Sequence, residues 1–492
     1  MFRLWRIGKF NKAKENLSPV SGAITSYNIK KILGDSSDVI IKDVYSYNKN
    51  IKIKIIAIDG MIDSKIIDES ILKPLTFDRF ILSSTNEKEV YKLVKEGLLY
   101  HVSQEEIPSL EDAITKILQG VTVVVFDGIK KAVAFDAKNI PQRSVTPPNE
   151  ENVLKGAKDA FVENIRTNTA LVRKKIKSLD LKIENFKIGT YTNTPVSVVY
   201  LDSIVNKDIL DKVIKRIKDM DIPNLISPEN FENSFKDNKY SIFPQLHYTE
   251  RVDKFCANLL DGKIGIIIDG LPIVYIVPGV LAMFLQAPED YSQNYVLSSA
   301  VRFMRYLCVW ISLILPAFYV AITTFHHEMI PTNLLISIIE SKEGVPFATF
   351  LEVLGLLLSF ELLLEASLRL PKSVGATISI IGALIVGEAA VNASFISPAV
   401  VVIVAITGVT GFVIPSQDFT NSIRVFRVIM VFIAGISGLF GLSFIILVIL
   451  AYLCKLETFG VPYFTPFAGN EWRNILKDTI VRLPRDVERV KR

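Results

Sequence analysis

The order of hydrophobic and polar positions divides the chain into two unlike parts. Charged residues occur throughout the first part, up to about Arg305, and four uncharged runs follow: Tyr306–His327, Ser373–Gly387, Ala389–Gln417 and Val428–Cys454. At a rise of about 1.5 Å per residue, about 20 apolar residues cross a hydrocarbon core about 30 Å thick. Three runs reach this length alone, and the second does so when residues 388–391 are included. The pattern therefore predicts an all-α polytopic membrane domain over residues 300–454.

A fifth segment, Pro346–Leu368, is rich in leucine but contains Glu352, Glu361 and Glu365. A carboxylate at the centre of a membrane helix costs about 2.5–3.5 kcal/mol on insertion scales. The segment therefore crosses inside a bundle, lies in the interface or is re-entrant, and Glu365 and Arg369 are spaced to neutralise each other. We expect four to five membrane helices and treat the three glutamates as membrane-buried carboxylates.

The positions of basic residues predict the orientation. Arg302 and Arg305 adjoin the first uncharged run, so the large N-terminal region should be cytoplasmic. The basic N-terminal stretch lacks the apolar core of about 7–15 residues that a signal peptide needs. If Pro346–Leu368 crosses the membrane, the basic tail at 455–492 lies outside; if it does not cross, the tail lies inside.

The charged part contains an internal duplication. The stretch LQGVTVVVFDGIKKAVAF around residue 120 matches LDGKIGIIIDGLPIVYIV around residue 262 at an offset of 142, and residues 56–75 match 199–217 at an offset of 143. Each copy is expected to have a strand, two helices and a hairpin. We predict a duplicated α+β region, with the first repeat at 1–140, a proline-rich linker at 141–152 and the second repeat at 153–290.

An Asp-Gly pair in each copy predicts a hairpin turn. Val121–Phe126 and Ile264–Ile268 are β-branched runs that precede Asp127 and Asp269, and a second apolar run follows each pair. Asp-Gly favours a two-residue type I′ turn, which needs positive φ at both central residues. We interpret the two aspartates as turn residues, although a role as metal or phosphate ligands stays open.

Composition and motifs narrow the possible functions. A net charge of +5 over 492 residues is too weak for a general nucleic-acid binder, and three cysteines cannot form the scaffold of a disulfide-built secreted protein. The mean hydropathy of +0.34 belongs mainly to the second part. The sequence has no P-loop, nucleotide-binding glycine motif, GxSxG or CxxC, and His326-His327-Glu328 lacks the spacing of a zinc motif. We expect no enzyme activity, no cofactor and no metal.

The segment Ser373–Val391 has the composition of a helix that approaches other helices closely, because it is rich in Gly, Ala, Ser and Thr. Thr377, Ile381, Leu384 and Glu388 recur at helical spacing and share one face. A face with polar ends and apolar residues between them is typical of a pore with a dewetting constriction. The alternative is a tightly packed interior helix with Glu388 near the lipid headgroups.

Several stretches, in order, resemble the A subunits of bacterial spore germinant receptors, the GerA family. They are PPNEENVLKGAKDAFVENIRTNTALVRKKIK (147–177), FPQLHYTERVDKFCANLLDGKIGIIIDGLPIVYIVPG (243–279), TTFHHEMIPTNLL (323–335), KEGVPFATFLEVLGLLLSFELLLEASLRLP (342–371), GEAAV (387–391), FVIPS (412–416) and LETFGVPYFTPF (456–467). The likeness spans about 140–492, with a fainter N-terminal part. Two departures stand out: the family usually has Gln where Glu388 stands and often Pro where His327 stands.

This resemblance implies a multipass subunit of the spore inner membrane that works with a transporter-like B subunit, which binds the nutrient, and a lipoprotein C subunit. It also implies that the chain forms a homo-oligomer in contact with membrane lipid and provides the gated ion pathway that triggers germination. Two alternatives stay open: a membrane scaffold that docks these partners, and a secondary transporter. Inverted repeats in the membrane half would support the transporter, and the sequence shows none there.

Overall fold

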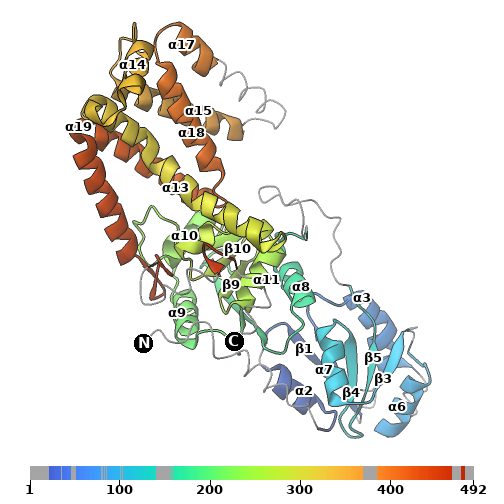
Figure 1. Cartoon of the computed structure of the whole chain (residues 1–492). Helices are drawn as coiled ribbons and strands as arrows, with labels where there is room; N and C mark the ends of the chain where they lie inside the picture. The colour runs from blue at the N-terminus through green and yellow to red at the C-terminus, as the bar shows by residue number, and fades with distance from the viewer. Residues whose placement is uncertain are drawn as a thin grey trace. The chain divides into compact units, whose positions relative to one another are not determined.

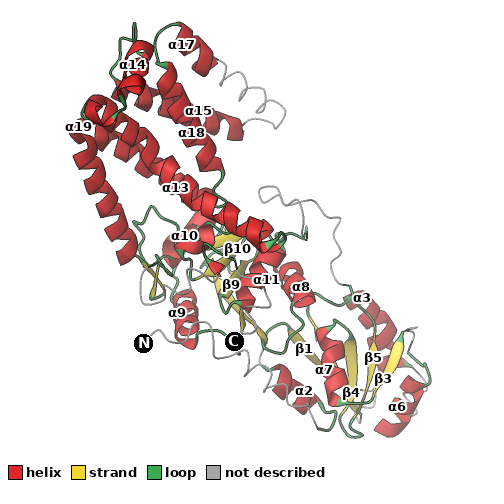
Figure 2. Ribbon diagram, in the orientation of Figure 1, coloured by secondary structure: helices red, strands yellow, loops and turns green. Residues whose placement is uncertain are grey.

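The computed structural model describes residues 22–139 (without 35, 46–50, 79–80, 82–83, 85, 100 and 102), 157, 159–369, 385–467 and 478–482. They fall into two compact units (Figure 1). The first contains the residues up to 239 together with 246–278, and the second contains 240–245 together with the residues from 279 onward. The described strands belong to the first unit, apart from one short hairpin near the C-terminal end, whereas the second unit is mainly helical (Figure 2).

The first unit contains an antiparallel sheet of five strands in the order β1-β2-β4-β5-β3. Val123 and Val125 of β4 belong to one hydrophobic core, and Val124 and Phe126 belong to another. Because side chains alternate between the faces of a strand, both faces of the sheet are covered. The elements are α2 (Ser26–Leu33), β1 (Val39–Tyr45), β2 (Lys52–Ile58), α3 (Ser64–Ile67), η1 (Asp68–Leu72), α4 (Lys73–Phe77), α6 (Glu87–Lys95), β3 (Gln104–Ile107), α7 (Leu110–Leu118), β4 (Thr122–Phe126) and β5 (Lys131–Phe135).

A second antiparallel sheet of the same unit has the order β6-β7-β9-β10-β8, which is equivalent to that of the first sheet strand by strand. Its central strand β9 lies 142 residues after β4, which is the offset of the sequence repeat. The elements are α8 (Ile165–Lys175), β6 (Leu181–Ile188), β7 (Thr194–Leu201), α9 (Lys207–Lys218), α10 (Pro228–Phe235), β8 (His247–Thr249), α11 (Val252–Leu260), β9 (Ile264–Ile268) and β10 (Val274–Val277).

A buried ion pair connects the two halves of this unit. The guanidinium of Arg173, in α8, donates from Nε to Oδ2 of Asp38 at 2.6 Å and from Nη2 to Oδ1 at 3.0 Å. Both side chains are less than 5% exposed, at 3% and 4%. A bidentate pair of this kind fixes orientation as well as distance, so it holds the start of β1 against α8.

The predicted two-residue turns are wrong, although both hairpins are present. Residues 127–130 connect β4 to β5, and residues 269–273 connect β9 to β10. Positive φ occurs at Lys130 and Gly270 rather than at both residues of each Asp-Gly pair. Asp127 instead accepts hydrogen bonds from Ser26, from N at 2.6 Å and from Oγ at 2.7 Å, and Asp269 accepts one from N of Ile165 at 3.0 Å. Each aspartate therefore satisfies a free N–H at the start of a helix, α2 or α8.

The second unit consists mainly of helices: α12 (Leu281–Phe284), η2 (Pro288–Tyr291), α13 (Tyr295–Thr324), η3 (His327–Met329), α14 (Thr332–Ser341), α15 (Thr349–Arg369), η4 (Ile385–Ala389), α17 (Ala390–Asn392), α18 (Pro398–Phe412) and α19 (Gln417–Lys455), followed by β11 (Glu457–Thr458) and β12 (Val461–Pro462). Within the described residues, α13 and α19 are long and apolar enough to cross a membrane, and α18 is a shorter apolar helix. We expected four to five membrane helices, and the described residues contain two helices that are both long enough and apolar enough.

The helix α19 reverses direction at Gly438, where φ is 60° and ψ is −144°. The rings of Phe426 and Tyr452 lie 4.9 Å and 6.3 Å from the same ring, Phe243. In a straight helix these two residues would be about 39 Å apart, so α19 consists of two antiparallel segments. The prediction of one uninterrupted span over Val428–Cys454 is wrong, because the reversal falls inside it and the run is apolar on both sides of the break.

Candidate functional site in the helical unit

The predicted pore face is only partly described. Thr377, Ile381 and Leu384 lie outside the described residues. Glu388 belongs to the π-helical turn η4, and its side chain is exposed. The shared face of these four residues therefore stays a prediction.

Glu352 is buried inside the helical unit. Its side chain, in the first turns of α15, is 3% exposed. The neighbouring side chains of Val353, Leu356 and Leu357 are also buried and form the buried face of that helix. The N–H of Ser397 donates to Oε2 at 2.8 Å, and Nζ of Lys342 lies 3.2 Å from Oε1. A hydrogen bond and a nearby cation offset the cost of removing this carboxylate from water.

The other two glutamates of α15 occupy different surroundings. Glu361 forms an ion pair with Arg424, and the two side chains are 25% and 24% exposed. Glu365 is exposed. The three carboxylates therefore do not form one cluster, and each of the first two has its own basic partner. Among the residues that the structure describes, no group of three or more His, Cys, Asp or Glu side chains could hold a metal ion.

A larger ionic cluster, which the sequence patterns did not reveal, lies at the start of α13. Asp290 is 2% exposed, and Arg302 and Arg305 are 1% and 7% exposed. Nε of Arg302 donates to Oδ2 of Asp290 at 2.9 Å, and Nη1 of Arg305 donates to both carboxylate oxygens at 2.8 Å. The two arginines that predicted the orientation are therefore also the buried partners of one aspartate.

The segment 478–482 completes this cluster. Nη1 of Arg302 donates to the Asp478 carboxylate at 2.8 Å and to its carbonyl oxygen at 2.9 Å. The guanidinium carbons of Arg302 and Arg482 each lie 5.2 Å from the ring centre of Tyr291, which is within range of cation–π attraction. Residues after the last helix are thus bound to the start of α13. We call Asp290, Arg302, Arg305, Asp478 and Arg482 the ionic clasp.

A backbone contact supports the same arrangement. The N–H of Leu281, which begins α12, donates to the carbonyl oxygen of Tyr463 at 2.9 Å. The segments before α13 and after α19 therefore meet at one end of the helical unit. Gly438 lies at the other end of α13, because a Cβ atom on it would be 3.0 Å from Cε1 of His326 and from Cβ of Phe325.

Arg427 replaces a backbone hydrogen bond that is missing near the centre of α13. Pro316 lies inside this helix and has no N–H, so the carbonyl of Ser312, four residues earlier, loses its usual donor. Arg427 is 2% exposed, and its Nε donates to that carbonyl oxygen at 2.7 Å. A second hydrogen bond joins Nη2 of Arg427 to Oγ of Ser312. Because Arg427 belongs to α19, these hydrogen bonds also join α19 to α13.

The chain is similar to spore germination proteins over most of its length. The family described as Bacillus/Clostridium GerA spore germination protein matches residues 27–492. A membrane protein of Bacillus subtilis, YfkQ, is 36% identical over 460 residues, which cover 93% of this chain and 88% of that protein. Spore germination protein KA of the same organism is 35% identical over 457 residues, 92% of this chain and 83% of that protein. Spore germination protein GerLA of Bacillus cereus is 30% identical over 459 residues, 93% of this chain and 92% of that protein.

One solved structure is also similar. The crystal structure of the N-terminal domain of the A subunit of the Bacillus megaterium spore germinant receptor GerK3 is 27% identical to this chain, with a TM-score of 0.40. The match covers 53% of this chain and 98% of that domain.

Proposed function

This chain belongs to the GerA family of spore germination proteins, and we propose that it is the A subunit of a nutrient-sensing spore germinant receptor. The observation that carries the proposal is the family match over residues 27–492, because it includes both the duplicated unit and the helical unit. Relatives that are named as spore germination proteins align with more than nine-tenths of this chain, which supports a common role for the whole molecule.

We further propose that the chain oligomerises and forms the gated ion-conducting part of the receptor. Two features support this finer proposal. The helix α13 is long and apolar enough for a membrane, and α19 contains two antiparallel apolar segments. Glu388 is an exposed carboxylate in a π-helical turn, a deformation that is frequent at functional sites. Thr377, Ile381, Leu384 and Glu388 are the proposed lining of the path.

The proposed receptor also contains a transporter-like B subunit and a lipoprotein C subunit in the spore inner membrane. In this proposal the nutrient binds the B subunit and shifts the A subunit from a closed to an open state, which requires that the bound B subunit prefer the open one. A scaffold that only docks these partners and a secondary transporter are the competing proposals.

Germination of spores tests the receptor role. Spores that lack this chain should lose the response to one nutrient class, and the wild-type gene should restore it. A Leu384→Ala variant should shift the nutrient dose–response or cause germination without nutrient, because it widens the proposed constriction. The matched control is Leu362→Ala, on the exposed side of α15, where the side chain is 72% exposed. If deletion leaves every nutrient response intact, the receptor proposal is wrong; if Leu384→Ala behaves as its control, the proposed gate is wrong.

The ionic clasp supports a proposal for the side of the membrane on which the C-terminal tail lies. Because residues 478–482 bind the start of α13, we propose that the tail and the N-terminal region both lie in the cytoplasm. Cys256, Cys308 and Cys454 are replaced by serine, and a single cysteine is introduced as Arg485→Cys or Tyr295→Cys. A membrane-impermeant maleimide should label both variants only from the cytoplasmic side. Labelling of position 485 from the opposite side would contradict this arrangement.

A further inference from the structure

The short helix α14 has an apolar surface that the described part of the chain leaves uncovered. Its sequence is TNLLISIIES, and none of its side chains is buried by the residues that the structure describes. The exposed fractions are 54% for Leu334, 49% for Ile336 and 61% for Ile339. Ile338 is a partial exception, because it packs against the core of the helical unit. An exposed cluster of large apolar side chains marks a surface that contacts something other than water.

The apolar and polar residues of α14 lie on opposite sides of the helix. At about 100° per residue, the apolar residues occupy an arc of about 200°; they are Leu334, Leu335, Ile336, Ile338 and Ile339. The opposite arc contains Asn333, Ser337, Glu340 and Ser341. Glu340 is the one charged residue of the helix. A helix divided in this way lies along a boundary between apolar and polar surroundings.

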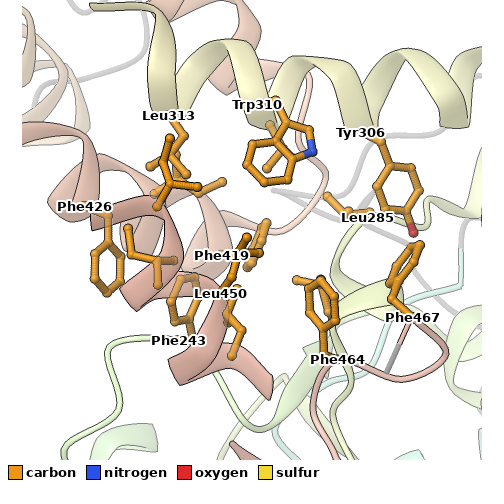
Figure 3. Close-up of a pocket in the computed structure, with 16 residues that line it drawn as sticks. Phe243, Leu285, Tyr306, Trp310, Leu313, Phe419, Phe426, Leu450, Phe464 and Phe467 are labelled. Atoms are coloured by element: carbon orange, nitrogen blue, oxygen red, sulfur yellow. The ribbon is translucent and has the colours of Figure 1, made fainter. Parts of the chain in front are cut away.

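The long helices next to α14 have sides that suit hydrocarbon. Figure 3 shows apolar and aromatic side chains of α13 and α19 around an apolar space of about 190 Å³. Trp310, which lines this space, is 43% exposed, and Leu447 on the return segment of α19 is 65% exposed. Side chains of this kind face lipid in a membrane-spanning bundle. The ends of α13 and of the two segments of α19 therefore mark the limits of the hydrocarbon region.

Three contacts place α14 at one of these limits. Gly438, where α19 reverses, lies beside Phe325, the residue that follows α13. A Cβ atom on Gly435 would be 2.5 Å from Cδ2 of Phe350, so α15 starts at the same level. Lys342, directly after α14, donates from Nζ to Oγ1 of Thr349 in the first turn of α15 at 2.5 Å. The helix α14 thus lies where α13 ends, where α19 reverses and where α15 begins (Figure 1).

From these observations we propose that α14 is an interfacial helix whose partner is the lipid bilayer, at the boundary between headgroups and acyl chains. Ile339 and Leu334 lie among the acyl chains, and Glu340 and Asn333 face the water. Because α14 contains no basic residue, it is held by its apolar area and not by anionic headgroups. This inference rests on the membrane insertion of α13, which is part of the proposed function, and it does not depend on nutrient response or ion conduction.

Fluorescence of single labels on the full chain in lipid nanodiscs tests the proposal. In the variant whose three native cysteines are serine, one cysteine is introduced as Ile339→Cys or Glu340→Cys and is labelled with a nitrobenzoxadiazole. The label at 339 should emit at shorter wavelength than the label at 340, because it lies in less polar surroundings. A phospholipid that carries a nitroxide near the start of one acyl chain should quench the label at 339 more, and aqueous iodide should quench the label at 340 more.

A second pair and a depth reference complete the design. Leu334→Cys and Asn333→Cys repeat the comparison one turn earlier on α14 and should give the same contrast. Phe318→Cys labels an exposed side of α13, and the nitroxide lipid should quench it wherever α13 is inserted. Replacing neutral phospholipid with anionic phospholipid should leave the quenching at 339 unchanged. Circular dichroism verifies that each variant is folded.

Three results would overturn the proposal. If iodide quenches the labels at 339 and 340 equally, α14 lies in water. If neither iodide nor the nitroxide lipid quenches the label at 339, a second copy of this chain covers the apolar face. If the quenching at 339 requires anionic lipid, headgroup charge and not apolar area holds the helix. Quenching of the label at 318 confines any of these failures to α14, whereas its absence would show that the proposed membrane insertion is itself wrong.

Discussion

Replacing Asp290 with asparagine should destabilise the helical unit, because this carboxylate is shared by two buried arginines. Its oxygens lie 2.9 Å from Nε of Arg302 and 2.8 Å from Nη1 of Arg305. Asparagine keeps the shape of the side chain but removes the negative charge. Arg302 would keep Asp478, whereas Arg305 would keep a contact of 3.3 Å with the carbonyl oxygen of Leu285.

Breaking a buried ion pair by removing one partner costs about 3–5 kcal/mol, because a charge is left uncompensated. Because Arg302 keeps Asp478 as a partner, the cost of Asp290→Asn should lie near the lower end of this range, at about 3 kcal/mol. The free energy of unfolding can be measured by denaturant titration of the full chain in a mild detergent, followed by circular dichroism. Glu328→Gln is the matched control, because it removes one carboxylate from an exposed position of the same unit and should change stability by less than about 0.5 kcal/mol.

A double-mutant cycle with Arg305→Gln gives the decisive comparison. The two substitutions should couple by about 2 kcal/mol, since each removes the partner of the other. Asp290→Asn should also speed tryptic cleavage after Arg482, whose Nη1 donates to the carbonyl oxygen of Asp290. Additivity within about 0.5 kcal/mol, together with unchanged cleavage, would refute the ionic clasp as a stabilising contact.

Three other substitutions test separate features. Gly438→Ala should lower stability by about 1–3 kcal/mol, because the residue has positive φ; thermal unfolding should show a larger loss than for Gly355→Ala, which has open space around it. Arg427→Met should cost about 1–3 kcal/mol by leaving the Ser312 carbonyl unpaired; adding Pro316→Ala, which restores an N–H, should recover part of the loss, and no recovery would contradict the repair. Hydrogen bonds from Lys95, Tyr91 and Lys131 lower the pKa of Glu106 from 4.5 to about 2, so this carboxylate stabilises the fold above pH 4.5 and loses that contribution as the pH falls toward 2. Amide hydrogen exchange in β3 should therefore depend less on pH in the Glu106→Gln variant than in the wild type. An unchanged pH dependence would rule out this stabilising role of Glu106.

The strongly apolar features of the fold could be predicted from the sequence. The runs that became β4 and β9 are continuous and β-branched, and the repeat at an offset of 142 is carried by these same residues. The outer strands at both edges of each sheet were missed. At one edge, β3 is QEEI and β8 has three residues, HYT. Such short, polar strands have no hydrophobic periodicity and are defined by their pairing with β5 and β10.

The ionic groups of the candidate site were harder to predict, because their partners are distant in sequence. Asp290 and Asp478 are separated by 12 and 176 residues from Arg302. A signal for one contact was nevertheless present: Pro316 inside an uncharged run leaves a carbonyl without a donor, and Arg427 directly precedes another such run. The reversal at Gly438 gave no comparable signal, since glycine is common in membrane helices and the residues on both sides are apolar.

Single-channel recording of the purified full chain in a planar lipid bilayer is the most direct test of the proposed ion-conducting role. We expect discrete conductance steps, and we expect Glu388→Gln to change the cation–anion selectivity of these steps because it removes a carboxylate from the path. Glu365→Gln, which removes an exposed carboxylate from α15, should leave the selectivity unchanged. A silent bilayer, obtained with folded and membrane-inserted protein, would contradict the ion-conducting role and favour a scaffold.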